Sequence, residues 1–207
     1  MADAATAPAP ASTSPSPAAA RAEIALRKAA ECKAAGNAHF KAGTPEDVAA
    51  AIKSYKFGIL YLRSILAYTD EDLAVSSFIS SDIAADEADV TAARELQTTL
   101  LSNLAASYLK QGKPEFARKY ADQGLTLQPK HPKLALFYGR ACVSLGASAQ
   151  AVEVLHSAAC EYTKNDATGK NLRTCLALAK EEAKLAHARY QARLAEHLAV
   201  HGVTPNN

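Results

Sequence analysis

The sequence has little of what several classes of protein require. It holds no tryptophan and one methionine, and no apolar run approaches the roughly eighteen residues of a membrane span. Basic and acidic residues nearly balance, at 23 Lys and Arg against 21 Asp and Glu, and the basic ones are spread along the chain with few aromatics among them. Nucleic-acid-binding domains usually gather basic charge on one face. We therefore expect no membrane segment and no nucleic-acid partner.

Cysteine is scarce, and its spacing shows no pairing. The four cysteines, at positions 32, 142, 160 and 175, form no C-x-x-C motif, and the N-terminal segment lacks the basic start and apolar stretch of a secretory signal. These features favour reduced thiols in a cytoplasmic protein. His156 and Cys160 stand four residues apart, which suits two metal ligands, but two ligands do not make a zinc site. We expect no metal and no other cofactor.

Sequence motifs of catalysis are also missing. The chain contains no G-x-x-x-x-G-K-[ST] phosphate loop, no G-x-S-x-G nucleophile elbow and no H-E-x-x-H metalloprotease motif. Its histidines and cysteines are scattered without a visible triad. The sequence therefore predicts a protein that is not an enzyme and has no small-molecule substrate.

Alanine is what the chain has in abundance, at 47 of 207 residues. Because alanine is the best helix former and alternating strand formers are scarce, the sequence predicts an all-α protein. Residues 1–22 are mostly Ala, Pro, Ser and Thr, a composition typical of a disordered tail. We expect one domain over 23–202, with helices near 23–42, 46–67, 92–111, 114–127, 132–145, 148–163 and 168–200.

Residues 68–93 interrupt the helical pattern with seven acidic residues and no Lys or Arg. This insertion carries −7 while the whole chain carries +2, so the remainder carries +9. One interpretation is a solvated, flexible loop. The other is an amphipathic segment, anchored by residues such as Leu73, Phe78 and Ile83, that folds toward a basic groove and competes with an acidic ligand. Deletion of 70–90 would then tighten ligand binding several-fold.

Part of the sequence repeats at an offset of 34 residues. Segment 103–108 aligns with 137–142, and Ala117 aligns with Ala151. A helix–turn–helix unit of 34 residues, with small residues where helices cross, is the tetratricopeptide period. We expect three such hairpins and a capping helix, stacked as a right-handed α-solenoid. The units are repeat 1 at about 29–67, repeat 2 at 98–131, repeat 3 at 132–165, and the capping helix at about 168–200.

In such a stack the first helices of the units line a concave groove. The side chains expected there are basic or amide: Lys33, Asn37 and Lys41 in the first unit, Asn103 and Lys110 in the second, and Lys133 in the third. Helical spacings of three, four and seven place the residues of each unit on one face. No carboxylate is interleaved among them. Because charge-assisted hydrogen bonds are stronger than neutral ones, the set suits a peptide carboxylate.

These residues resemble a known peptide-binding pattern. Lys33-Ala-Ala-Gly-Asn37, Ser-Asn103-Leu-Ala-Ala-Ser-Tyr and Pro-Lys133 are similar to the dicarboxylate-clamp tetratricopeptide domains of the chaperone organising protein, the large immunophilins and protein phosphatase 5. The resemblance covers about 23–200. It implies a co-chaperone or adaptor that holds the acidic C-terminal tail of a seventy- or ninety-kilodalton heat-shock chaperone. The long insertion and long terminal helix also resemble the tetratricopeptide repeat protein 9 family.

One position departs from the clamp pattern. Phe137 stands four residues after Lys133, where the clamp family usually has arginine. Arg140, seven residues after Lys133, returns to within about 20° of it around the helix and could supply the missing cation. Phe137 could instead offer an apolar contact to a different ligand. The alternative function is therefore a scaffold whose groove binds another peptide, or its own acidic insertion, without recognising a chaperone tail.

Overall fold

Helices make up nearly all of the described chain. The computed structural model describes residues 16–66, 86–164 and 166–200, with side chains up to residue 197, and contains no strand in these ranges. The helices are α1 Pro17–Ala42, α2 Pro45–Leu66, α3 Glu87–Lys110, α4 Pro114–Leu127, α5 Pro132–Ser144, α6 Ser148–Glu161 and α7 Ala167–Val200. The predicted all-α class is confirmed.

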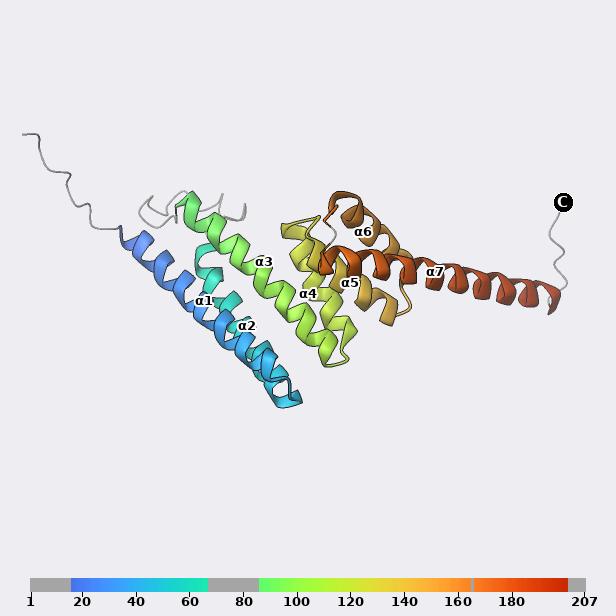
Figure 1. Ribbon diagram of the computed structural model, residues 1–207, viewed down its shortest axis with the longest axis horizontal. Helices are drawn as coiled ribbons and strands as arrows, with labels where there is room; N and C mark the ends of the chain where they lie inside the picture. The colour runs from blue at the N-terminus through green and yellow to red at the C-terminus, as the bar shows by residue number, and fades with distance from the viewer. Residues whose placement is uncertain (1–15, 67–85, 165, 201–207) are drawn as a thin grey trace, which may run out of the picture.

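The helices pair into hairpins that stack in chain order (Figure 1). The hairpins are α1–α2, α3–α4 and α5–α6, and the second helix of each packs on the first helix of the next unit or on α7. The helices α1, α3, α5 and α7 also contact one another in succession. One layer of the stack is therefore built from these four helices, and it is the layer on which a groove was expected.

Equivalent turns confirm the 34-residue offset. Gly112 and Gly146 lie 34 positions apart, and both have positive φ, at 69° and 73°. A side chain with a Cβ is strained in this left-handed region, so glycine is favoured at both turns. Pro114 then begins α4, where its missing N–H costs no helical hydrogen bond. The two turns reverse the chain in the same way in consecutive units.

Small residues allow the helices to cross closely. Ala105, Ala117 and Ala151 are fully buried at positions where the repeat predicts close contact. A Cβ on Gly139 would lie 2.5 Å from a methyl carbon of Leu155, which is closer than real contacts. Alanine and glycine at these positions let neighbouring helices approach closely, and the small side chains fill the contact without leaving voids.

Two predicted boundaries are wrong. Helix α1 begins at Pro17, so residues 17–22 of the expected tail are helical. Ser16 Oγ accepts a hydrogen bond from Ala19 N at 3.2 Å, and Ala18 and Ala22 are buried. Buried alanine side chains are sufficient to order this segment where another helix packs closely against it. Residues 1–15 lie outside the described part.

The expected acidic insertion also ends earlier than predicted. Helix α3 begins at Glu87, and Asp86 Oδ1 accepts a hydrogen bond from Glu87 N at 2.7 Å. Three acidic residues of the insertion, Asp86, Glu87 and Asp89, therefore cap or form the first turn of a helix, where negative charge is stabilising. Residues 67–85 lie outside the described part, so the two interpretations of the insertion stay predictions.

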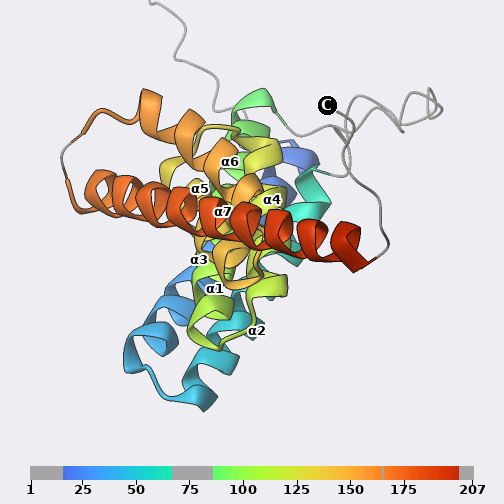
Figure 2. The same ribbon diagram turned by 90° about the vertical axis from the view of Figure 1, so that its right-hand side faces the viewer.

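Helix α7 has a packed half and a projecting half. Leu172, Cys175 and Ala179 are buried against α5 and α6, whereas residues 184–197 are exposed. Figure 1 shows the C-terminal half extending past the other helices, and Figure 2 shows the packed half lying across the end of the stack. No described helix has both the length and the hydrophobicity of a membrane span.

Candidate functional site

The structure brings together the two asparagines that the sequence placed in different repeats. Asn37 on α1 and Asn103 on α3 are 66 residues apart, and Asn103 Nδ2 donates a hydrogen bond to Asn37 Oδ1 at 3.0 Å. Tyr55 Oη on α2 donates to the same Oδ1 at 2.9 Å. Three helices therefore meet at one side-chain amide.

Two donors on one oxygen determine what the amide pair offers to a ligand. An amide oxygen has two lone pairs, and both of those on Asn37 Oδ1 are used. The Asn37 NH₂ group makes no hydrogen bond within the described residues and remains a donor. The amide pair and Tyr55 line a cavity of about 160 Å³ together with Phe40 and Ala106. This cavity presents N–H donors and suits an acceptor such as a carboxylate.

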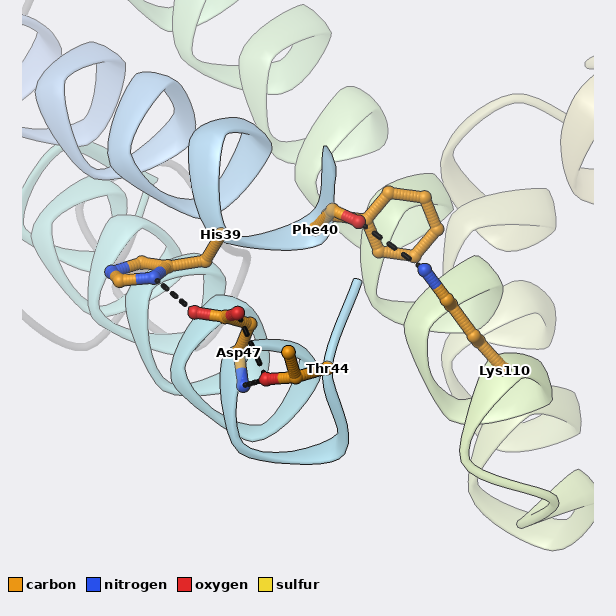
Figure 3. Close-up of polar contacts among 5 residues, drawn as sticks. All are labelled: His39, Phe40, Thr44, Asp47 and Lys110. Atoms are coloured by element: carbon orange, nitrogen blue, oxygen red, sulfur yellow. Dashed lines mark hydrogen bonds and ion pairs between the residues drawn. The ribbon is translucent and has the colours of Figure 1, made fainter. Parts of the chain in front are cut away.

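Lys110 extends this donor set at the end of the first hairpin. Its ammonium nitrogen donates to the Phe40 carbonyl oxygen at 3.3 Å and lies 4.8 Å from the centroid of the Phe40 ring (Figure 3). That carbonyl belongs to the last turn of α1, where cations are stabilised and carbonyls lack helical partners. An ammonium group has three N–H donors. Lys110 is therefore held in place with donors still free for a ligand.

A polar turn holds the end of α1 in position beside Lys110. Thr44 Oγ1 donates to Asp47 Oδ2 at 2.8 Å and accepts from Asp47 N at 3.1 Å, while His39 Nδ1 lies 3.3 Å from Asp47 Oδ1 (Figure 3). The hydrogen bond from Thr44, followed by that from His39, holds the pKa of Asp47 below its usual range. The charged Asp47 carboxylate on α2 thus contacts His39 on α1, the residue next to Phe40.

The remaining predicted cations lie on the same layer of helices. Lys33, half buried, and Lys41, exposed, stand four residues before and after Asn37 on α1, and neither forms an ion pair with a described residue. Lys133 is exposed in the first turn of α5. Burial lowers the pKa of the neighbouring His131, and the charge of Lys133 lowers it further. These three lysines keep their charges available to a ligand.

Arg140 and Phe137 occupy different surroundings on α5. Arg140 is exposed and lines a cavity between α5 and α7. Phe137 is half buried and packs against Ala105 and Leu134, which belong to the contact between repeats. The geometry therefore gives the phenylalanine a packing role and directs the arginine toward the capping helix.

Sequence reasoning missed Tyr55 and Phe40 as parts of the site. Tyr55 is 1% exposed, burial raises the pKa of its hydroxyl, and its ring fits against Gly36, where a Cβ would come within 2.4 Å. A buried tyrosine hydroxyl usually needs a hydrogen-bond partner. That rule could have predicted a partner on the facing helix, although it could not have predicted which one.

The described residues contain no cluster of three or more potential metal ligands. His156 Nε2 and Cys160 Sγ are 3.8 Å apart on the exposed face of α6. All four cysteines are free. The candidate site for a ligand is the cavity where the side-chain amides of Asn37 and Asn103 meet.

Comparisons with known proteins support the fold. No protein-family model and no curated protein matches the sequence. Among solved structures, the C-terminal TPR-containing domain of a protein described as FK506-binding, from Plasmodium falciparum, is similar with a TM-score of 0.63 and 22% identity. The match covers 81% of this chain and 95% of that domain.

A second similar structure is the Hsp90 co-chaperone Cns1 from Saccharomyces cerevisiae, with a TM-score of 0.51 and 18% identity. That match covers 86% of this chain but 46% of the Cns1 chain, so this chain spans about half of that protein. At these identities the likeness establishes the fold. The chain has the tetratricopeptide architecture of three helical hairpins and a capping helix, a right-handed α-solenoid.

Proposed function

We propose that this protein is a cytoplasmic adaptor or co-chaperone, without catalytic activity, that binds the acidic C-terminal peptide of a seventy- or ninety-kilodalton heat-shock chaperone. The observation that carries the proposal is the donor set formed by the Asn37–Asn103 pair and the Lys110 ammonium group. A terminal carboxylate has two oxygens that accept several hydrogen bonds, which matches such donors. The similarity in fold to a known Hsp90 co-chaperone supports the same function.

The proposal assigns the residues of a dicarboxylate clamp to three helices. Residues that bind peptide carboxylates are Lys33, Asn37, Asn103, Lys110, Lys133 and Arg140, and residues that line the groove are Lys41 and Phe137. None of the four cations in this set forms an ion pair with a described acidic residue, and the Asn37 NH₂ group makes no hydrogen bond with a described residue, so these groups are available to the peptide. The long interval between α2 and α3 and the long α7 also support kinship with the tetratricopeptide repeat protein 9 family.

The alternative is a scaffold that binds a different peptide through Phe137. Its ring is half buried against Ala105 and Leu134, so part of its surface already contributes to the repeat contact. The donor cavity, by contrast, suits a charged acceptor best, because a hydrogen bond to a carboxylate is stronger than one to a backbone carbonyl. These observations favour recognition of a carboxylate over an apolar contact.

A titration with one peptide in two forms tests the proposal. The probe is a ten-residue acidic peptide that ends in aspartate, either with a free C-terminal carboxylate or amidated. We expect amidation to weaken binding about tenfold or more, because it removes a charge-assisted hydrogen-bond acceptor from a donor site. We also expect the affinity for the free peptide to fall as salt rises from 50 mM to 500 mM, since the partners are oppositely charged.

Two variants and a matched control separate the site from general charge effects. Asn103→Ala removes one amide of the pair, and Lys133→Glu reverses one predicted cation; both are expected to weaken binding of the free peptide. Lys53→Glu makes the same charge change on an exposed position of α2, outside the groove, and should bind like the wild type. Binding that ignores amidation, survives Lys133→Glu and shows no salt dependence would contradict the clamp.

A further inference from the structure

The second helices of the hairpins, α2, α4 and α6, form the other layer of the stack, and this layer carries exposed apolar side chains. On α2, Phe57 is 46% exposed and Leu60 is 57% exposed, and on α4 Phe116 is 48% exposed. Large apolar side chains that gather on a surface mark interaction sites, whereas scattered ones do not. We call the surface that they share with three neighbouring residues the outer patch: Lys53, Lys56, Phe57, Leu60, Phe116 and Tyr120.

Aromatic rings join α2 to α4 across the end of α3. The Tyr108 ring on α3 stacks on Phe116, with 5.2 Å between the centroids, and on Tyr120, with 5.4 Å between them. Lys56 Nζ on α2 lies 5.6 Å from the centroid of Tyr108 and 5.9 Å from that of Tyr120. A cation is attracted to the negative face of an aromatic ring, so Lys56 connects α2 to the rings of α4. The outer patch is therefore one surface shared by two helices.

The α2 part of the outer patch has helical spacing. Phe57 follows Lys53 by four residues, and Leu60 follows Lys56 by four, so these side chains share the exposed face of α2 over about two turns. The cations and the apolar side chains alternate along this face. A ligand that covers it must therefore combine apolar and charged groups at a similar spacing, which an amphipathic helix does.

The charge of the outer patch is positive and uncompensated. Residues 48–66 contain no Asp or Glu, and neither Lys53 nor Lys56 forms an ion pair with a described acidic residue. The carboxylates of α4, Glu115 and Asp122, line a separate cavity that α4 forms with α5 and α6. A partner that covers the patch is therefore expected to bring negative charge.

The arrangement of the rings favours a protein partner over a nucleic acid. Bases stack on free aromatic faces. Tyr108 is 6% exposed and lies between two other rings, and Lys56 covers both Tyr108 and Tyr120. A bound helix needs no free ring face, because its apolar side chains pack against exposed groups such as Leu60 and Phe116.

We propose that the outer patch binds an acidic amphipathic helix of a partner protein. The apolar face of that helix packs on Leu60 and Phe116, and its carboxylates pair with Lys53 and Lys56. This surface lies on the layer opposite the Asn37–Asn103 cavity, so it does not depend on the function proposed above. A protein with both sites holds two partners at the same time.

A designed peptide tests the outer patch on the full chain. The probe is an eighteen-residue peptide with leucines at helical spacings of three and four and glutamates at most other positions. Its C-terminus is amidated, so that it brings no terminal carboxylate to the amide pair. By fluorescence anisotropy we expect it to bind about tenfold more tightly than a peptide of the same composition whose leucines do not share a face.

Two variants, each with a matched control, locate the binding. Leu60→Ser should weaken the helical peptide about fivefold, whereas Leu185→Ser, at a residue 50% exposed on the projecting part of α7, should not. Lys53→Glu should weaken it about three- to tenfold, because it replaces an attraction by a repulsion. Lys133→Glu makes the same change on the other layer and should leave this peptide unaffected. All four positions are exposed, so the variants are expected to fold.

Several results would overturn the proposal. Equal binding of the two designed peptides, or equal effects of Leu60→Ser and Leu185→Ser, would remove its basis. Competition by the acidic tail peptide would place the designed helix in the groove instead. A several-fold gain in affinity on neutralising the acidic residues 70–72 would assign the patch to the chain's own insertion, and self-association lost in Leu60→Ser would assign it to a second copy. If the designed peptide binds and the tail peptide does not, only the function proposed above is refuted.

Discussion

The substitution Tyr55→Phe tests how the site is held in place. The tyrosine hydroxyl donates to Asn37 Oδ1 at 2.9 Å, and the ring is 1% exposed and packed against Gly36. Phenylalanine keeps the ring and its packing, so the variant removes one hydrogen bond and little else. In the proposed clamp Tyr55 is a positioning residue, because its hydroxyl donates the hydrogen bond that orients the Asn37 amide.

The structure gives the expected size of both effects. A net hydrogen bond contributes about 0.5–1.5 kcal/mol, so we expect the free energy of unfolding to fall by about 1 kcal/mol and the melting temperature by roughly 2–4 °C. Once one donor is removed, Asn37 can rotate and present its oxygen to the ligand. We expect binding of the free acidic peptide to weaken about three- to tenfold, while binding of the amidated peptide changes less.

Isothermal titration calorimetry with the free and amidated peptides measures the binding effect, and urea denaturation measures the stability effect. Tyr61→Phe is the matched control, because Tyr61 is 42% exposed and its hydroxyl has no described partner. An unchanged ratio of affinities for the free and amidated peptides in Tyr55→Phe would refute the positioning role, even if stability fell. If Tyr61→Phe lowered this ratio of affinities by the same amount, the effect would come from losing any tyrosine hydroxyl and not from the position of Tyr55.

Three further predictions concern the fold that supports the site. Gly139→Ala places a Cβ 2.5 Å from Leu155 and should lower the free energy of unfolding by about 1–3 kcal/mol in urea denaturation; a neutral result would mean that α5 and α6 can move apart at little cost. Asp47→Asn should destabilise the protein near pH 6, and its difference from the wild type should shrink as the pH falls below 3.8, the ordinary pKa of an aspartate. The reason is that Asp47, whose pKa is lowered on folding, stabilises the fold when it is charged and loses this effect as the pH falls through the folded pKa; a pH-independent difference in melting temperature would contradict it. Asp86→Ala removes the cap of α3 and should cost about 1 kcal/mol, whereas Asp86→Asn should retain most of it, as measured by circular dichroism during urea unfolding.

The sequence predicted most of the helices because their signals are local. Gly112 and Pro114, together with Gly146, mark turns that depend on backbone conformation, and the structure places helix ends within a few residues of them. The errors at 17–22 and 86–93 have the same origin. In both places a cap and a neighbouring helix stabilise a segment whose composition alone is typical of a loop or tail.

The candidate site was also only partly predictable from the sequence. Spacing along one helix placed Lys33, Asn37 and Lys41 on a common face, because helical periodicity depends only on positions within that helix. It could not show that Asn37 and Asn103 touch, since their contact depends on how closely α1 and α3 approach across the buried ring of Tyr55.

The sequence by itself determined the all-α class, the hairpin period and the residue types available to a ligand, because turns, helix propensity and charge are properties of short segments. Only the tertiary structure decided which of those residues meet. The angle and distance between packed helices direct Arg140 toward α7, pack Phe137 between repeats and hold Lys110 over the last turn of α1. Those angles follow from the fit of many small buried side chains at once, which no single segment contains.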